Sequence, residues 1–256
     1  MDYILLPSTI EFKPTNNPHL GEFVITPCHQ GYGTTLANSL RRVLLSSIEG
    51  AAVEAVQIEG VQHEFSAVPG VLEDAIEIML NLKQLAVISH SDTPITLRLV
   101  KKGKGDVTAA DFEKNADIEI INTDLKIATV SDDKKAFSME VIIGKGLGYV
   151  PAASKESKNL DLGTIVMDSF YSPIKDVGYS IENTRVGDIT DYEKLTIRIE
   201  TNGTITPRVA VERATRIIMD HFRLILDTIE QMPSEETVVV PEETEKKKKK
   251  SKKDEE

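Results

Sequence analysis

The sequence contains a single cysteine, Cys28, among its 256 residues. One thiol cannot form an intrachain disulfide, and alone it cannot build a structural zinc site, which needs several thiolate or imidazole ligands. The histidines do not supply the missing ligands, because they are scattered without ligand-like spacing, at His19, His29, His63, His90 and His221. The sequence therefore predicts a reduced, buried thiol, no bound metal and no cofactor held by this chain.

Long apolar runs are also missing. No stretch approaches the roughly 20 apolar residues that cross a bilayer, and the first residues, Met-Asp-Tyr-Ile-Leu-Leu-Pro, lack the basic region of a signal peptide. The 40% of apolar residues is nevertheless enough to fill a core. We therefore expect a cytoplasmic protein with no membrane partner.

Excess positive charge is the third absence, since the net charge is -11. Nucleic acids are bound largely by Lys and Arg side chains that release counterions from phosphates. We therefore expect little direct DNA binding by the folded body. The run Lys246 to Lys250 is an exception, but acidic residues flank it closely, and blocks of like charge are usually disordered. Residues 233–256 are predicted to be a disordered charged tail, with a nucleic-acid-binding arm as the alternative.

Familiar catalytic motifs are absent as well. No G-x-S-x-G nucleophile motif occurs. The stretch Gly144 to Gly148 resembles a phosphate-binding loop, but no Lys-Ser or Lys-Thr follows it and no helical pattern begins there, so its glycines are interpreted as a sharp turn at a strand end. The carboxylates of Glu73, Asp74 and Glu77 are interpreted as the solvated face of a helix. No catalytic residue is predicted in this chain.

The hydrophobic patterns present predict an α+β fold with antiparallel sheets, because strands and helices do not alternate regularly. Alternating patterns predict strands at 22–26, 53–58, 95–100, 137–143, 177–181 and 195–200. Helical periodicity predicts helices at 34–48, 71–85 and 207–229. Thr206 and Pro207 suit the start of the last helix, and Gly50 follows the first. The segments 101–122 and 152–161 are predicted loops.

The first helix has an unusual polar side. Its core-facing stripe consists of Leu36, Leu40, Val43 and Leu44. On the opposite side Leu45 stands among Asn38, Arg41 and Arg42. This arrangement is typical either of an ordinary exposed apolar residue or of a protein contact, since interfaces favour arginine beside an apolar anchor.

The last helix has too many apolar positions for one contact. Its apolar side chains spread around more than half its circumference, whereas a helix resting on one sheet needs only about a 100° stripe. The helix must therefore face two apolar surfaces, its own sheet and either a second domain or another subunit. We favour a second copy of the chain, because two-fold homodimers are the commonest oligomers.

Several motifs carry a specific resemblance over about residues 21–229. They are Gly31-Tyr-Gly-Thr-Thr-Leu-Ala-Asn-Ser-Leu-Arg-Arg-Val-Leu-Leu-Ser-Ser47, Glu59-Gly-Val-Gln-His-Glu-Phe-Ser66, Glu73-Asp74, Leu80-Asn-Leu-Lys83, Val107-Thr-Ala-Ala-Asp111, Gly146-Leu-Gly-Tyr-Val-Pro-Ala152, Tyr171-Ser-Pro173 and Glu200-Thr-Asn-Gly-Thr204. In type and order they resemble the amino-terminal region of bacterial RNA polymerase alpha subunits. Members of that family carry a further carboxy-terminal DNA-binding domain where this sequence has its charged tail, so the domain is expected to be either naturally missing or truncated.

The resemblance implies two domains and a scaffolding role. Residues 1–50 and 175–232 would form a dimerisation domain of an antiparallel sheet with two helices, interrupted by an inserted, mostly-β domain at 51–174. The homodimer would nucleate assembly of the beta and beta-prime subunits of a nucleotidyltransferase that transcribes DNA into RNA, with omega and sigma joining in the holoenzyme. The alternative is a free-standing dimeric small-molecule enzyme, which would need a pocket with converging titratable groups.

The resemblance also implies which residues make each contact. The dimer interface would comprise Leu36, Leu40, Ile217, Ile218, Phe222 and Ile225. The beta-subunit contact would comprise Asn38, Arg41, Arg42 and Leu45. The beta-prime contact would comprise Lys83, Met167, Asp168, Tyr171 and Pro173.

Overall fold

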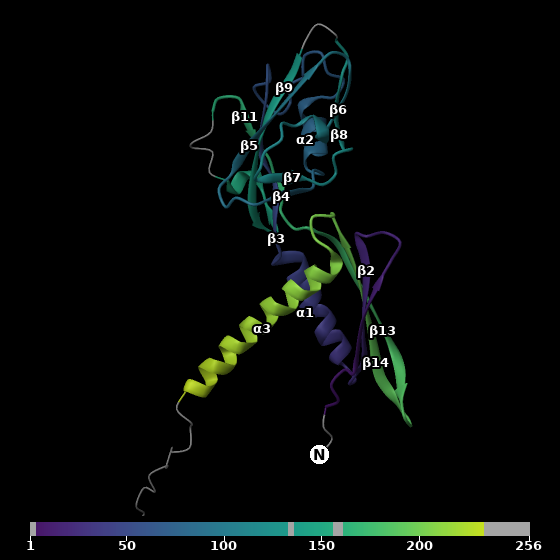
Figure 1. Cartoon of the computed structure of the whole chain (residues 1–256). Helices are drawn as coiled ribbons and strands as arrows, with labels where there is room; N and C mark the ends of the chain where they lie inside the picture. Colours follow the sequence, from purple (N-terminus) through teal and green to yellow (C-terminus); the bar gives the residue numbers. More distant parts are fainter. Residues whose placement is uncertain (1–3, 133–135, 156–160, 233–256) are drawn as a thin grey trace, which may run out of the picture. The chain divides into compact units, whose positions relative to one another are not determined.

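A computed structural model describes residues 4–132, 136–155 and 161–232. The predicted charged tail therefore lies outside the described residues. Within them the chain is α+β and its paired strands are antiparallel, as predicted (Figure 1). In the part of the chain that the structure describes, no helix combines the length and apolar character that a membrane span requires. Among the described residues, those up to Met219 belong to one compact unit and Asp220 to Met232 belong to a second.

The helices are α1 (Tyr32–Ser46), α2 (Ala75–Leu82) and α3 (Pro207–Gln231), with short 3-10 turns at Ala109–Asp111 and Ala152–Ser154. The strands are β1 (Thr9–Pro14), β2 (Leu20–Cys28), β3 (Glu49–Ile58), β4 (Val87–Ser89), β5 (Ile95–Lys102), β6 (Gly105–Thr108), β7 (Ile118–Ile120), β8 (Lys126–Val130), β9 (Ala136–Leu147), β10 (Tyr149–Val150), β11 (Thr164–Val166), β12 (Ser169–Phe170), β13 (Ile174–Val186) and β14 (Ile189–Thr201).

One sheet joins the two ends of the chain. Its strand order is β1-β2-β14-β13, so strands from the beginning of the chain pair with strands from its end. Figure 1 shows β2, β14 and β13 side by side. Leu195 and Ile197 of β14 stand opposite Ile25 and Phe23 of β2. A hydrophobic core forms between this sheet, α1 and the start of α3, with Leu44 and Ile174 fully buried in it.

The middle of the chain builds a second core. Its main sheet has the order β5-β9-β3-β4-β7, with β11 also pairing to β3, and β6 and β8 form a separate two-stranded ribbon. Alternate residues of the strands, such as Val141 and Ile143 of β9, point into a core that they share with Ile78 of α2. The chain thus holds two separate hydrophobic clusters, one from its ends and one from its middle.

The predicted loop at 101–122 is wrong in part. This segment contains β6, β7 and a 3-10 turn, which are too short for their periodicity to be recognised in the sequence. The turn is fixed by Asp111, whose carboxylate accepts hydrogen bonds from the Thr108 amide at 2.9 Å and from the Lys101 ammonium at 2.7 Å. In the other predicted loop, 152–161, the 3-10 turn Ala152–Ser154 replaces irregular chain, and residues 156–160 lie outside the described residues.

The acidic residues of the second helix have structural roles. The helix is shorter than predicted, because Asp74 is its N-cap and accepts a hydrogen bond from the Glu77 amide at 2.8 Å. Glu73 lies before the helix and its carboxylate holds β8 through the amide and hydroxyl of Thr129, at 2.6 and 2.8 Å. At the last helix, by contrast, Thr206 caps the Val209 amide at 3.4 Å and Pro207 is the first helical residue, as predicted.

Three glycines of β3 and β9 leave room for neighbouring groups that a Cβ would displace. Gly50 lies in β3, two residues beyond the point where the first helix was predicted to end, and a Cβ there would overlap the carbonyl oxygen of Tyr171. Gly144 to Gly148 were interpreted as a sharp turn at a strand end. That interpretation was wrong for Gly144 to Leu147, because β9 continues to Leu147 and only Gly148 lies beyond it. A Cβ at Gly144 would overlap the carboxylate of Glu54, and one at Gly146 would lie 2.8 Å from the ring of Tyr171.

The close approach at Gly50 predicts a strong effect of added volume. We expect Gly50→Ala to lower the free energy of unfolding by about 1–3 kcal/mol, because the Tyr171 carbonyl belongs to the backbone and cannot turn away. Gly178→Ala is the control, since nothing lies within 4 Å of its Cβ position. Chemical denaturation of both variants measures the difference, and equal stabilities would contradict this account.

Candidate functional site

The face of α1 that carries the arginines is open to solvent. Gly33, Ala37, Leu40 and Leu44 point into the protein core, and Asn38, Arg41 and Arg42 are exposed. We call these three exposed residues the Arg42 face. Leu45 was expected to stand among the arginines on the exposed side of the helix, but its side chain is half-buried and packs against the same core as Leu40. The exposed part of the predicted beta contact is therefore polar.

The Arg42 face is attached to the sheet beneath it. The hydroxyl of Tyr179, on β13, donates a hydrogen bond to the side-chain oxygen of Asn38 at 3.1 Å. The Asn38 amide is neutral, so the charges that this face presents are the two guanidinium groups. Guanidinium groups form forked hydrogen bonds with carboxylates, which makes the face suited to an acidic or carbonyl-rich partner surface.

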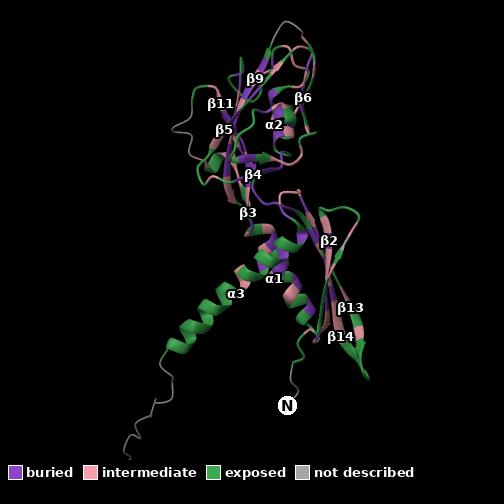
Figure 2. Cartoon of the chain, in the orientation of Figure 1, coloured by how far each residue is buried: buried purple, intermediate pink, exposed green. Residues whose placement is uncertain are grey.

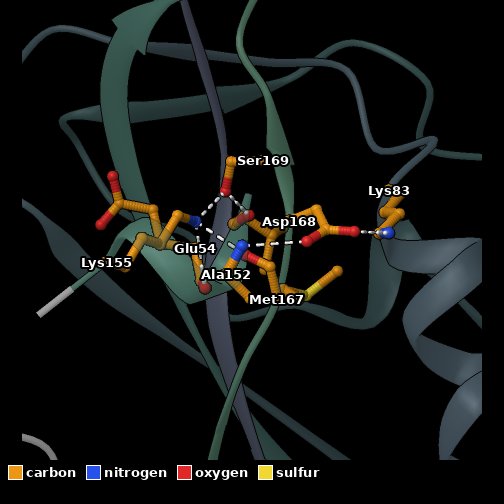
Figure 3. Close-up of polar contacts among 8 residues, drawn as sticks. Glu54, Lys83, Ala152, Lys155, Met167, Asp168 and Ser169 are labelled. Atoms are coloured by element: carbon orange, nitrogen blue, oxygen red, sulfur yellow. Dashed lines mark hydrogen bonds and ion pairs between the residues drawn. The ribbon is translucent and has the colours of Figure 1, made fainter. Parts of the chain in front are cut away.

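Two residues predicted for the beta-prime contact lie 85 positions apart in the sequence but are paired in the structure. The Lys83 ammonium, at the end of α2, lies 3.0 Å from Oδ2 of Asp168, and both side chains are 35% exposed. The other oxygen of Asp168 accepts a hydrogen bond from the Ala152 amide at 2.9 Å (Figure 3). That amide, and then Lys83, lower the pKa of Asp168 below its usual value. The pair is thus a fixed polar feature at the surface.

The other residues predicted for the beta-prime contact are inside the protein. Met167 is 1% exposed, Tyr171 is 5% exposed and Pro173 is buried. The Tyr171 hydroxyl donates to the Glu54 carboxylate at 2.5 Å, and burial together with that carboxylate raises the pKa of Tyr171. In this form of the chain these three side chains can support a contact surface but cannot themselves touch a partner.

A half-buried lysine, Lys155, joins several parts of the same region. Lys155 was not singled out in the sequence, because it lies in a segment predicted to be a loop. Its ammonium donates to the Met167 carbonyl at 2.7 Å, to the Ser169 hydroxyl at 2.5 Å and to the Glu54 carbonyl at 3.4 Å (Figure 3). The Ser169 hydroxyl in turn donates to the Val53 carbonyl at 2.6 Å. Burial lowers the pKa of Lys155. We call this arrangement the Lys155 network.

The Lys155 network borders a cavity of about 260 Å³ that Glu54, Tyr171 and several apolar side chains also line. The cavity brings titratable groups together, as the small-molecule enzyme alternative requires. However, these groups bind one another, since Tyr171 donates to Glu54 and Lys155 is surrounded by three acceptors. The arrangement stabilises the fold and does not favour that alternative.

Exposed apolar side chains on α2 were missed by the sequence analysis. Ile76 and Leu80 lie one turn apart on α2, and Leu72 precedes the helix; all three are exposed. Lys83 follows Leu80 at the next turn, so the apolar stripe leads to the Lys83–Asp168 pair. The helical periodicity of 71–85 contained this stripe, but pattern alone does not show which apolar positions the core leaves uncovered.

The helix α3 changes character along its length. In its first part Ala210, Val211 and Ala214 are buried, and the predicted interface residues Ile217 and Ile218 are half-buried. From Met219 to Gln231 every residue is exposed (Figure 2). The exposed apolar residues of this distal part are Met219, Phe222, Leu224, Ile225, Leu226 and Ile229. Contiguous exposed apolar surface of this kind marks protein–protein contact sites.

Comparison with known proteins identifies the family. The model of the RNA polymerase Rpb3/RpoA insert domain matches residues 56–172. The chain is 49% identical over 222 residues to the DNA-directed RNA polymerase subunit alpha of Symbiobacterium thermophilum, which covers 84% of this chain and 70% of that protein. The corresponding subunit of Desulfitobacterium hafniense is 48% identical over 222 residues, 87% of this chain and 70% of that protein.

The chain belongs to the family of bacterial DNA-directed RNA polymerase alpha subunits. A third alpha subunit, from Alkaliphilus metalliredigens, is 44% identical over 230 residues, 90% of this chain and 73% of that protein. The resemblance recognised in the sequence is thereby confirmed. The residues that match the insert-domain model, 56–172, contain most of the second hydrophobic core. The exact domain boundaries, and the contact residues assigned above, stay predictions.

The Lys155 network predicts a measurable loss of stability. Lys155→Met should lower the free energy of unfolding by about 1–3 kcal/mol, because it leaves the Met167 carbonyl without its charged donor. Lys175→Met, at an exposed position of β13, is the matched control and should change stability by less than about 0.5 kcal/mol. If the two variants unfold at the same denaturant concentration, the network does not stabilise the fold.

The lowered pKa of Asp168 predicts a pH dependence. Its folded-state pKa lies below the unfolded-state value of about 4, so the carboxylate stabilises the fold above that value and the contribution is lost as pH falls through the folded-state pKa. Because the pair is partly exposed, the contribution should stay below about 1 kcal/mol. Melting temperatures from pH 7 to pH 3 should show wild type above Asp168→Asn at neutral pH, with the difference shrinking in acid. A difference independent of pH would contradict the assignment.

Proposed function

We propose that this chain acts within RNA polymerase as a homodimeric scaffold, on which one protomer receives the beta subunit and the other receives the beta-prime subunit. The alpha-subunit function follows from the family, whose members named above are DNA-directed RNA polymerase alpha subunits. The proposal adds the partners: a second copy of the chain, beta and beta-prime, with omega and sigma in the holoenzyme. It also holds that the chain works in the cytoplasm and contributes no catalytic residue to the nucleotidyltransferase.

The exposed apolar surface of α3 is the observation that carries this proposal. Burying one large apolar side chain contributes about 1.5–3 kcal/mol, and the distal part of α3 exposes several, including Phe222 at 62% and Ile225 at 54%. A two-fold dimer uses the same patch on both protomers, which doubles the apolar area removed from water. Ile217 and Ile218, which are half-buried, lie on the same helix between this exposed surface and the buried first part of α3. Of the α1 residues predicted for the interface, Leu36 is half-buried and Leu40 lies in the core, so the exposed apolar surface proposed for the dimer belongs to α3.

The Arg42 face supports the beta contact. It places two exposed guanidinium groups on a rigid helix, and arginine is favoured at interaction hot spots. Leu45 would act by packing α1 onto its sheet and not by touching the partner. This division of roles replaces the simpler expectation that all four predicted residues meet the beta subunit directly.

The surface around Lys83 and Asp168 supports the beta-prime contact. The pair stands beside exposed apolar residues of α2, so charged and apolar groups are available together, as they are in typical interfaces. Met167, Tyr171 and Pro173 would hold this surface in shape from the interior. The proposed contact residues are therefore Lys83, Asp168 and the exposed stripe of Ile76 and Leu80.

The dimer is tested by adding charge to the apolar surface of α3. Phe222→Glu should convert the dimer into a monomer in analytical ultracentrifugation at micromolar concentration, because a carboxylate buried without a partner is strongly unfavourable. Arg223→Glu is the matched control, since it introduces the same side chain on the polar side of the same turn and should leave the dimer intact. A wild-type monomer would contradict the proposal.

The beta contact is tested at Arg42. Arg42→Ala should abolish co-purification with a co-expressed beta subunit while leaving dimerisation intact. Arg42→Lys should be tolerated only in part, because an ammonium cannot make a forked hydrogen bond. Arg98→Ala, which removes an exposed arginine from β5, serves as the control and should have no effect. Unchanged co-purification of Arg42→Ala would rule out the proposed role of this residue.

A further inference from the structure

Helix α1 begins without the usual capping groups. Its N-cap is Gly31, in the left-handed conformation with φ of 83°, so the helix has no capping side chain of its own, and its first turn contains no acidic residue. The first four N–H groups of a helix have no partners within the helix, and they carry the positive end of its dipole. A helix that starts in this way needs an acceptor from elsewhere in the chain.

The acceptor is Glu193 on β14, which lies 162 positions from Gly31 and 160 from Gly33 in the sequence. One carboxylate oxygen accepts a hydrogen bond from the Gly31 amide at 2.9 Å, and the other accepts from the Gly33 amide, also at 2.9 Å. The carboxylate thus spans the start of α1 with both oxygens and places a negative charge at the positive end of the helix. Hydrogen bonds to ionised acceptors are about twice as strong as those between neutral groups.

Several neighbouring residues lie close to the Glu193 carboxylate or to the residues that it binds. A Cβ at Gly33 would lie only 2.6 Å from Oε2 of Glu193, so a glycine is required there for the oxygen to reach the amide. Glu193 stands opposite Cys28 of β2, and the register between β14 and β2 shifts between Glu193 and Leu195. His29 packs edge-on against Tyr32 and Tyr192, on either side of the same junction. Three elements therefore meet at the Glu193 carboxylate.

A second clamp lies farther along the helix. As described above, Tyr179 of β13 donates a hydrogen bond to Asn38. The two strands of one hairpin, β13 and β14, therefore hold α1 at its first turn and again about two turns later. Arg41 and Arg42 occupy the next turn. The buried side chains Ala37, Leu40 and Leu44 pack one face of α1 against the core, and these two contacts hold the same rotation from outside the core. That rotation decides where the guanidinium groups point.

We propose that Glu193 is a positioning residue for beta-subunit binding: its carboxylate clamps the first turn of α1 and thereby orients the Arg42 face. The inference rests on the proposed function, because it assumes that this face meets the beta subunit. It assigns to Glu193 a role that no sequence pattern near Arg42 indicates. It also explains why Gly33 stands in the first turn of α1, although glycine is otherwise unfavourable within a helix.

The test uses the full chain, alone and co-expressed with the beta subunit. Glu193→Ala should speed hydrogen exchange of the amides in 31–36 by about tenfold, reduce beta co-purification several-fold, and leave the dimer seen by sedimentation unchanged. Glu193→Gln should fall between wild type and Glu193→Ala, because an amide group has one acceptor oxygen and no charge. Glu182→Gln is the matched control, since Glu182 lies on the same hairpin and pairs with Lys194 at 3.0 Å; it should behave as wild type.

Gly33 provides an independent arm. Gly33→Ala should reproduce the loss of beta binding, because its Cβ displaces the carboxylate. The double variant Gly33→Ala with Glu193→Ala should bind beta no more weakly than Glu193→Ala alone, since the clamp is already absent. Strictly additive losses would show that the two residues act separately and would overturn the inference.

The outcomes separate this inference from the proposed function. If Arg42→Ala loses beta but Glu193→Ala and Glu193→Gln retain it, the positioning role is overturned and the proposed function stands. If exchange in 31–36 quickens while beta binding is unchanged, Glu193 has only a structural role. If Arg42→Ala itself retains beta, the proposed function is overturned and the inference with it. Should Glu193→Ala fail to fold, the comparison of Glu193→Gln with Glu182→Gln decides, and wild-type behaviour of Glu193→Gln would overturn the inference.

Discussion

The close contact between β3 and the segment that returns from the middle of the chain is the constraint on which the two cores depend. The chain leaves the first core at β3 and comes back to it at β13, and in between it builds the second core. At the crossing, Gly50 approaches the Tyr171 carbonyl so closely that no side chain fits between them. Because of this contact, the chain enters the middle segment at residue 50 and leaves it at residue 171 in the same place.

Several side chains pack or form hydrogen bonds at this crossing. The Tyr171 ring occupies the space beside Gly146, its hydroxyl binds Glu54, and Lys155 binds the carbonyls of Met167 and Glu54 from below. Asp168 follows Met167 in the short link between β11 and β12, and its carboxylate pairs with Lys83. The surface that we propose for beta-prime is thus the outer side of the same junction, and its stability depends on buried polar contacts that are fully paired among themselves.

The sequence was informative where a pattern repeats along one element. The alternation of Met139, Val141 and Ile143 predicted a buried strand, and the wide apolar arc of α3 predicted a helix with more to bury than its own sheet covers. It was uninformative where the decisive contacts join distant positions. Nothing near Lys83 points to Asp168, and nothing near Gly31 points to Glu193, because a hydrogen bond between residues 85 or 162 positions apart leaves no periodic trace. Leu45 was misplaced for a related reason, since the neighbouring strands that bury it are not visible in the helical pattern.

In the proposed assembly, two copies of this chain form the platform for one copy each of two larger subunits. Native mass spectrometry of the complex purified with co-expressed beta and beta-prime measures this stoichiometry directly. The account predicts a mass that contains two copies of the chain with one beta and one beta-prime. A stable complex that contains a single copy of the chain would contradict it.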